Sequence, residues 1–445
     1  MHRFIPQLAE KAAPRYTSYP TAAEFDARVG GAEQRAAIAA VAPGEAVSLY
    51  VHIPYCRDIC WYCGCNTGAV GRGDRLPGYI DAVIAEAAGV ATMLRGTVTS
   101  VHFGGGSPNA LAPADFARLA AGLRALFSPA PDTEWAAELD PRGLDEHYAQ
   151  QLALAGITRA SLGVQSFAPH IQARINRIQP LGTIADAVAA LRGAGIARVN
   201  FDLMYGLPGQ RLDDIAATIA RTRAFAPDRV AMFGYAHLPA MLPRQRMIDE
   251  AALPDAASRF WQSALAHDLL VEAGYRAIGF DHFARPDDPL ALAAVQGRLR
   301  RNFQGFTDER AAVTIGLGAS AISQFDQLIV QNEKHVGRYR MLVSNGQAAG
   351  VRGVARSADD RIRAAAIERL LCDGAVDLAD HADPVRLRAM LDAAGTPLDR
   401  LARLGVCRRA GTRIELTAIG RPYARLVARA LDARRAVPAG ISRAV

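Results

Sequence analysis

The stretch YVHIPYCRDICWYCGCN, residues 50–66, contains four of the six cysteines of the chain within ten positions. The cysteines follow the apolar segment 48–55, whose composition is typical of a buried β-strand. Four thiols this close together can form a disulfide, a closed metal site, or a metal cluster that stays open to a further ligand. The rest of the chain is needed to separate these three interpretations.

Composition removes the first interpretation. The chain has 445 residues, enough for a large domain and a smaller one, and 50% of them are hydrophobic. No apolar run reaches about 18 residues, so we expect no transmembrane helix. The N-terminus lacks the apolar core of a signal peptide, so a cytoplasmic protein is expected. Disulfides are disfavoured in that compartment, which leaves metal binding or catalysis for the thiols.

The net charge of +7 comes almost entirely from arginine, because Lys11 and Lys334 are the only lysines. The basic residues are spread along the chain without a long run, so no nucleic-acid partner is expected. Guanidinium groups grip carboxylates with two parallel hydrogen bonds. The composition is therefore compatible with a substrate that carries several carboxylates.

Short apolar runs alternate with amphipathic helical stretches from about residue 47 onward, in six strand–helix units. This alternation predicts an α/β fold with a parallel sheet, either a Rossmann sheet or a full or partial TIM-type barrel. The expected strands cover 48–55, 98–106, 134–141, 159–166, 198–209 and 228–238; the clearest helices cover 77–94 and 113–127.

Polar and glycine residues recur at the carboxyl ends of these strands. In a barrel such positions surround one mouth, where active sites are built. The residues are the cysteines, Gly104 to Ser107, Glu138, Asp140, Gln165, Asp202, and Tyr235 to His237.

The alternation is lost after about residue 350. Residues 398–431 predict a helix, two short strands with a turn at Gly411, and a second helix, which resembles a winged-helix module. We therefore expect an N-terminal extension over 1–46, a catalytic barrel with an extended sheet over 47–350, and a mostly helical cover domain over 351–445. Cys372 and Cys407 are expected to be small buried apolar residues of that last region.

The spacing of the cluster is Cys56-x3-Cys60-x2-Cys63-x-Cys65. A zinc ribbon needs two separated cysteine pairs, and a ferredoxin cluster uses different gaps. A closed site made by all four thiols remains an alternative. Three cysteines on a loop after a strand can instead hold three irons of a [4Fe–4S] cluster and leave the fourth iron open to another ligand.

This loop, its preceding strand and the glycine run after the second strand resemble the radical S-adenosylmethionine (SAM) enzymes. Further blocks resemble the oxygen-independent coproporphyrinogen III oxidase family: PRYTSYPTA, FGGGSPNAL, ELDPRGL, SLGVQSF, FDLMYGLPGQ, FGYAHLP, GFDHFARPDD, RNFQGFT and GLGASAIS. The resemblance covers most of the chain. It implies a partial (β/α) TIM-type barrel with a smaller C-terminal domain, a [4Fe–4S] cluster, and two SAM molecules per chain.

The resemblance also implies roles for particular residues. Three cysteines would bind the cluster, namely Cys56, Cys60 and Cys63. The first SAM would contact Tyr50, Tyr62, Gly105, Glu138 and Ile322. The second SAM would contact Gly106, Ser107, Gln165, Arg177, Asp202 and Ala236. Ser107 stands where threonine is more usual and Tyr62 where phenylalanine is more usual; the hydroxyl and the ring are retained.

Cys65 is expected to lie outside the coordination sphere, as a catalytic thiol or as a packing thiol. His52, His237 and His282 are either core histidines or donors in a substrate pocket.

The function implied is the heme-biosynthetic oxidation of coproporphyrinogen III to protoporphyrinogen IX. Two propionates become vinyl groups with loss of carbon dioxide, after a 5'-deoxyadenosyl radical removes a β-hydrogen. A monomer reduced by a flavodoxin or ferredoxin is expected. Three alternatives remain: a related heme chaperone, another radical SAM enzyme acting on a tetrapyrrole, and a structural metal protein. Cys65 and residues 301–307 argue against the chaperone, which lacks this cysteine and carries a His-Asn…Tyr-Trp signature at the latter place.

Overall fold

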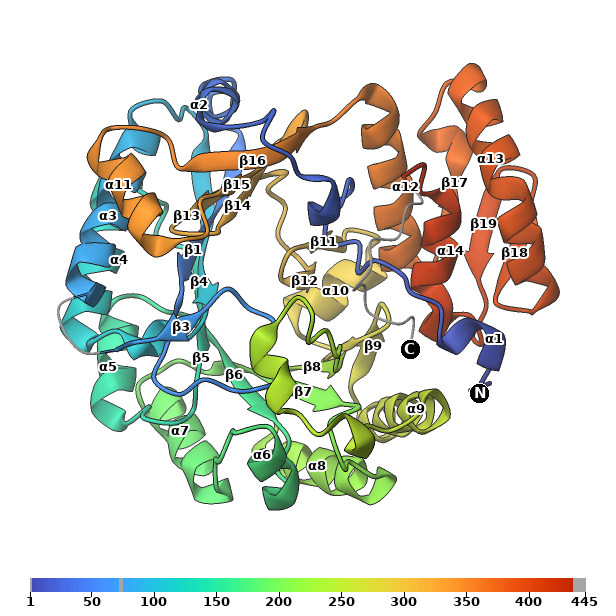
Figure 1. The fold of residues 1–445 in the computed structure, drawn as a ribbon, viewed down its shortest axis with the longest axis horizontal. Coiled ribbons are helices and arrows are strands. Elements are labelled where there is room, and N and C mark those ends of the chain that lie inside the picture. Colours follow the sequence, from blue (N-terminus) through green and yellow to red (C-terminus); the bar gives the residue numbers. More distant parts are fainter. Residues whose placement is uncertain (1, 72–74, 435–445) are drawn as a thin grey trace.

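Six parallel strands form the centre of one twelve-stranded sheet in the computed structural model, which describes residues 2–71 and 75–434 (Figure 1). The six strands neighbour one another in chain order, as expected for successive strand–helix units. They are β1 (Ala46–Ile53), β4 (Thr97–Gly105), β5 (Glu134–Leu139), β6 (Arg159–Gln165), β7 (Arg198–Tyr205) and β8 (Arg229–Gly234).

Helices connect these strands and cover the outer face of the sheet (Figure 1). They are α3 (Arg75–Ala91), α4 (Pro113–Phe127), α5 (Glu146–Leu154), α6 (Pro169–Arg174), α7 (Leu181–Gly193), α8 (Leu212–Phe225) and α9 (Ala256–Glu272). N-capping side chains fix where several of these helices begin. The Asp145 side chain accepts from the Tyr148 amide at α5, and the Asp255 side chain accepts from the Ser258 amide at α9.

Shorter strands extend the sheet at both edges. On the β1 side, β13 (Val313–Leu317) pairs parallel with β1 and is followed by β14 (Ile322–Gln324), β15 (Leu328–Asn332) and β16 (Gly350–Ala355). On the β8 side lie β10 (His282–Ala284) and β9 (Arg276–Ile278), both antiparallel. Over the described residues the two outermost strands do not pair, so the barrel is partial. The predicted α/β fold with a partial barrel is confirmed.

The first predicted strand is too long by two residues at its carboxyl end. It stops at Ile53 because Pro54 has no N–H to continue the ladder. Tyr55 and Cys56 belong instead to a separate short strand, β2 (Tyr55–Cys56), which pairs with β3 (Gly68–Ala69). The cysteine loop therefore starts at β2 and ends at β3, a separate pair of two-residue strands beyond the carboxyl end of β1.

The C-terminal region is helical with a three-stranded sheet. Its elements are α12 (Ala358–Asp373), β17 (Ala375–Asp377), α13 (Pro384–Arg403), β18 (Cys407–Ala410), β19 (Arg413–Leu416) and α14 (Ala424–Leu431). Gly411 makes the turn between β18 and β19 with φ +60°, as predicted. Cys407 is buried as expected, whereas Cys372 is only partly buried. The last eleven residues of the expected cover domain, 435–445, and residue 1 lie outside the described residues.

The N-terminal extension packs on this C-terminal region (Figure 1). The Tyr423 hydroxyl accepts a hydrogen bond from the Ile5 amide at 2.8 Å, and the Tyr16 hydroxyl donates to Asp432 at 3.0 Å. The boundary expected after residue 350 coincides with the start of β16, and the division into three domains stays a prediction. Across the described chain, none of the helices combines the length and apolarity that a membrane crossing requires.

Candidate active site

The carboxyl ends of the parallel strands open into one cavity of about 720 Å³. Such a mouth is where α/β barrels place their chemistry. Thirteen of the fifteen candidate residues line it: Cys56, Cys60, Tyr62, Cys63, Cys65, Gly105, Gly106, Ser107, Glu138, Gln165, Arg177, Asp202 and Ala236. The other two, Tyr50 and Ile322, lie elsewhere.

The cysteine loop presents its thiols at different depths. Cys60 is buried, Cys56 and Cys63 are half-buried, and Cys65 is exposed. Hydrogen bonding from Cys65 lowers the pKa of the Cys63 thiol to about 6, and the Cys65 amide lies 3.3 Å from the Cys63 sulfur. Burial raises the pKa of Cys56 to about 11, against the hydrogen bond from Thr67. The loop therefore holds one thiol that ionises readily, Cys63, and one whose ionisation burial disfavours, Cys56.

Contacts from distant segments close the loop. Gln245, only 1% exposed, donates from Nε2 to the carbonyls of Tyr62 at 2.9 Å and Ala236 at 3.1 Å. Arg244 donates to the Thr67 carbonyl at 2.7 Å. These two side chains follow β8, so the end of the sixth parallel strand braces the loop that follows the first. Sequence reasoning missed both residues.

The glycine run after β4 is packed too tightly for side chains. A Cβ at Gly106 would lie 2.5 Å from both Thr67 Oγ1 and the Tyr55 carbonyl oxygen. A Cβ at Gly105, whose φ is +110°, would lie 2.6 Å from the His52 ring. Glycine is needed here because the cysteine loop and His52 approach the backbone closely. The expected contact of the run with bound SAM stays a prediction.

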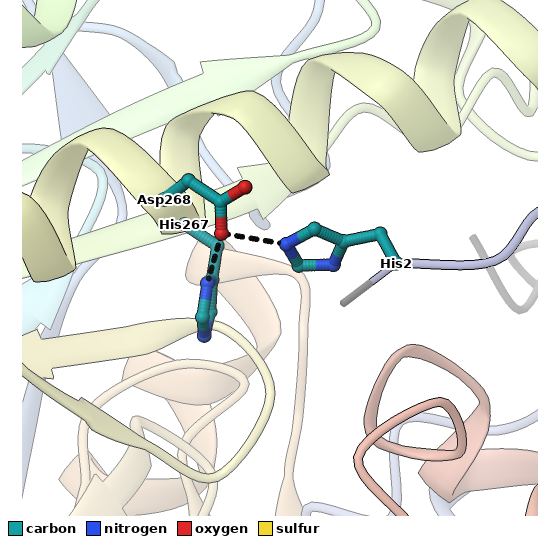
Figure 2. Close-up of side chains that lie close together, drawn as sticks. All are labelled: His2, His267 and Asp268. Carbon is teal, nitrogen blue, oxygen red and sulfur yellow. Dashed lines mark hydrogen bonds and ion pairs between the residues drawn. The ribbon is translucent and has the colours of Figure 1, made fainter.

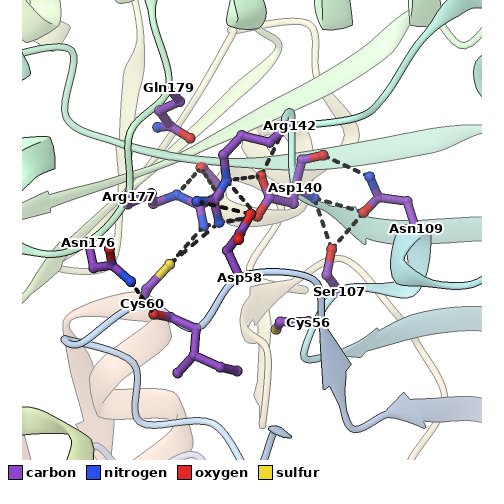
Figure 3. A network of polar contacts seen from close by, with 12 residues as sticks. Cys56, Asp58, Cys60, Ser107, Asn109, Asp140, Arg142, Asn176, Arg177 and Gln179 are labelled. Atoms are coloured by element: carbon purple, nitrogen blue, oxygen red, sulfur yellow. Dashed lines mark hydrogen bonds and ion pairs between the residues drawn. The ribbon is translucent and has the colours of Figure 1, made fainter. Parts of the chain in front are cut away.

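A network of guanidinium, carboxylate and thiol groups lies beneath the loop (Figure 3). Arg177 Nη1 lies 3.3 Å from the Cys60 sulfur and 3.2 Å from Asp140 Oδ2. Arg142 Nη2 lies 2.7 Å from Asp140 and 3.6 Å from the same sulfur. Burial alone would raise the pKa of Asp140, yet the two guanidinium groups hold it below its usual value. Two guanidinium groups thus lie against the Cys60 sulfur.

Arg142 was missed as a site residue, although it lies in the block ELDPRGL that carries part of the resemblance. Arg177 was predicted, but with a different set of contacts. Its Nε and Nη2 both donate to the Gly163 carbonyl, which fixes the plane of the guanidinium group. Every nitrogen of Arg177 is therefore engaged by other groups of the protein.

Glu138 lies at the end of β5 next to the glycine run. Its Oε1 is 3.1 Å from His102 Nε2, and its Oε2 is 3.4 Å from the Gly105 amide. Tyr50 stacks on His102 with ring centroids 6.1 Å apart, and its hydroxyl lies 3.1 Å from His52 Nδ1. Tyr50 is thus linked to Glu138 through histidine without lining the cavity. His102 was not singled out from the sequence.

Asp202 projects from β7 into the same mouth. Burial and the nearby charge of Glu138 raise the pKa of Asp202 to about 6. Its Oδ2 accepts a hydrogen bond from the Ser161 hydroxyl at 3.1 Å. Gln165 sits beside it at the end of β6 with φ +63°, an uncommon conformation outside glycine. A carboxyl group poised near neutrality and a conformationally constrained amide both face the cavity.

The remaining candidates lie at the periphery. Ile322 belongs to β14 and packs against Phe25 among a small apolar cluster. His282 is buried and bonded to Asp281 at 2.7 Å, and His237 is 2.8 Å from the Tyr235 hydroxyl. The structure thus gives each histidine a protein partner.

A further polar cluster is separate from this cavity (Figure 2). Asp268 Oδ1 lies 2.7 Å from His2 Nε2 and 3.2 Å from His267 Nδ1. These two contacts join the three side chains, and the first places His2 against α9. No member of the cluster lines the main cavity.

Comparison with known proteins agrees with this geometry. Residues 50–221 match the family model of the Radical SAM superfamily. The oxygen-independent coproporphyrinogen III oxidase of Bradyrhizobium diazoefficiens is 44% identical over 431 residues, 95% of each chain. That of Paracoccus denitrificans is 42% identical over 446 residues, 98% of each chain. The solved coproporphyrinogen III oxidase of Escherichia coli, described as a radical SAM enzyme, superposes with a TM-score of 0.89 at 35% identity, over 94% of this chain and 97% of that one. The chain therefore belongs to the family of oxygen-independent coproporphyrinogen III oxidases, within the Radical SAM superfamily.

Proposed function

We propose that the protein converts coproporphyrinogen III to protoporphyrinogen IX without oxygen, by oxidative decarboxylation of two propionate side chains in heme biosynthesis. The observation that carries this proposal is the shared cavity. Three cysteines spaced x3 and x2 open into the space that is lined by the glycine run, Glu138 and Asp202. The family supplies the reaction, and this arrangement is what the reaction requires.

The residues present fit the cofactors of the family, a [4Fe–4S] cluster and SAM. Cys56, Cys60 and Cys63 supply thiols on one loop, and two guanidinium groups contact the sulfur of Cys60. The glycine run lets the backbone of β4 lie directly against the cysteine loop at the cavity wall. When bound, the reduced cluster and SAM supply the carbon radical that removes a hydrogen atom from the substrate.

The protein's own groups bind and orient in this proposal. Glu138, at the wall beside Gly105, accepts from the amine of the first SAM, with Tyr50 and Ile322 supporting that side. Gln165, Asp202, Ser107 and the backbone of Gly106 and Ala236 face the second. The carboxylate of the second SAM would compete with Asp140 for Arg177, since Arg177 Nη1 lies 3.2 Å from Asp140 Oδ2.

The setting of the reaction is part of the same proposal. A flavodoxin or ferredoxin would deliver one electron for each SAM cleaved, and each loss of carbon dioxide would release one electron to an external electron acceptor. The chain would act as a monomer in the cytoplasm, where cysteine ligands stay reduced.

An anaerobic assay tests the proposal. The chain is reconstituted with iron and sulfide, reduced, and given SAM and coproporphyrinogen III, and the products are oxidised to porphyrins and separated. We expect protoporphyrin together with stoichiometric methionine. Tight porphyrin binding without any decarboxylated product would contradict the proposal and favour a heme-binding chaperone.

A further inference from the structure

A second cavity, of about 200 Å³, lies between the N-terminal extension, the edge of the sheet and α12. Four arginines line it, Arg300, Arg301, Arg356 and Arg361, against two acidic residues, Asp326 and Glu368. Four guanidinium groups facing two carboxylates leave an excess of positive charge. Cations confined in this way favour an anion among them.

Arg301 is the most constrained of the four. Its side chain is nine-tenths buried, with the guanidinium carbon 4.4 Å above the Phe306 ring and 4.9 Å from that of Phe280. Nη2 donates to the Arg15 carbonyl at 3.1 Å, but the buried Nη1 has no partner among the described residues. A buried guanidinium nitrogen without an acceptor is costly, and burial lowers the pKa of this arginine.

Its neighbours are incompletely paired in the same way. Arg356 Nη1 donates to the carbonyls of Phe325 and Asp326 at 3.3 and 3.1 Å, while its buried Nε has no acceptor within the described chain. Arg361 pairs through Nη1 with Asp326, and its Nε is likewise buried without a partner in that part of the chain. Three of the arginines that line this cavity thus each have one buried nitrogen without a hydrogen-bond partner among the described residues.

We propose that this cavity binds a carboxylate or phosphate oxyanion, held by Arg301, Arg356 and Arg361. Planar guanidinium forks match such groups, and the four arginines that line the cavity outnumber its two carboxylates. Tyr16 lines both this cavity and the main one, so the two spaces are neighbours. The anion is either a free ion or a side-chain carboxylate of the tetrapyrrole; only the second source rests on the proposed function.

Binding is tested on the full chain purified without its cluster, so that failure of the catalytic assay does not affect the result. The probes are inorganic phosphate, succinate and coproporphyrin III, the last being an air-stable ring with four carboxylates. Each is titrated at low ionic strength, by calorimetry for the ions and by fluorescence for the porphyrin. Arg356→Gln and Arg361→Gln should each weaken binding about tenfold or more, the effect of losing one charged hydrogen bond.

Two further variants sharpen the test. Arg338→Gln, at an exposed position on α11 (Val336–Ser344), removes the same charge away from the cavity and should leave affinity unchanged. Asp326→Asn removes a competing carboxylate whose side chain is 71% exposed, and should tighten binding. Because these positions are partly exposed, folding is less at risk than with Arg301→Gln.

The pattern across probes identifies the source of the anion. Weakened phosphate or succinate binding with unchanged porphyrin binding indicates a free ion. Weakened porphyrin binding indicates that a ring carboxylate reaches the cavity. Affinities for all three probes that are the same in wild type, Arg356→Gln, Arg361→Gln and Arg338→Gln would overturn the proposal, as would a lack of binding by every probe.

Discussion

Arg177 Nη1 lies 3.3 Å from the sulfur of Cys60 and joins the segment after α6 to the cysteine loop. The same nitrogen lies 3.2 Å from Asp140 Oδ2, so one cation serves a thiol and a carboxylate at once. Arg177 is only 6% exposed, which keeps both interactions out of bulk water and makes them stronger. The position of Cys60 therefore depends on charge as well as on packing.

Replacing Arg177 by alanine should weaken catalysis and the fold together. Asp140 would keep only Arg142 as a partner, so we expect the cluster-free chain to lose about 1–3 kcal/mol of unfolding free energy in urea. Iron content after reconstitution should stay near four per chain, while activity at limiting SAM falls. Arg174→Ala, on a half-exposed neighbour, is the control. Unchanged stability and activity in Arg177→Ala would contradict both assignments.

Serine substitutions separate the ligating cysteines from Cys65. Cys60→Ser should lose the cluster and all SAM cleavage, because three ligands hold the proposed cube. Cys65→Ser should keep the iron and the spectrum, since it preserves the backbone amide 3.3 Å from the Cys63 sulfur and a side-chain group that can donate to that sulfur. Iron analysis and electron paramagnetic resonance of the reduced proteins measure this. Equal loss of iron in both variants would show that the ligands are misassigned.

Gly106→Ala, which adds one methyl group, should disrupt the proposed SAM-binding site. The new Cβ would lie 2.5 Å from the Tyr55 carbonyl oxygen, so the cysteine loop would have to shift. We expect a destabilisation of about 1–3 kcal/mol, the usual cost of overpacking, and loss of SAM binding by equilibrium dialysis. Gly89→Ala in α3 meets open space and should be neutral or stabilising by up to about 1 kcal/mol. Similar behaviour of the two variants would argue against a tight cradle.

We expect the difference in stability between wild type and Asp202→Asn to depend on pH. Its pKa of about 6 is above the ordinary value of 3.8, so the folded chain bears a cost whenever this carboxyl group is ionised. Asp202→Asn should therefore be more stable than wild type by about 1–3 kcal/mol at pH 8. The difference in unfolding free energy should shrink by about half at pH 5. It should disappear at lower pH, where Asp202 is protonated in both the folded and the unfolded wild-type chain. Thermal or urea unfolding of the cluster-free proteins measures it; a difference that grows on acidification would reverse the assignment.

Much of the sheet was predictable because buried strands and amphipathic helices follow simple periodicities. The helix expected over 113–127 is α4 with the same bounds. Glu138, near the end of β5, and Asp202, inside β7, both line the cavity at the mouth of the barrel. The first strand was overextended because periodicity does not register the missing N–H of Pro54.

The rest depended on contacts that no local pattern encodes. Gln245 lies in a short 3₁₀ segment, Pro243–Met247, yet its amide reaches the Tyr62 carbonyl across 183 positions of the sequence. Arg142 acts on the site through Asp140 and the Cys60 sulfur, and His102 acts through Glu138 on the neighbouring strand. Their residue types alone are those of ordinary surface or core positions, so only the three-dimensional arrangement reveals them.

Strand β1 pairs with both β4 and β13, so it should resist local unfolding more strongly than the cysteine loop that follows it. Amides in the middle of such a strand should exchange hydrogen with solvent only when the whole domain unfolds. The cysteine loop, held by the two-residue strands β2 and β3 and by side-chain contacts, should open at a far smaller free energy. Iron can therefore enter or leave the loop while the strand that carries it stays in register.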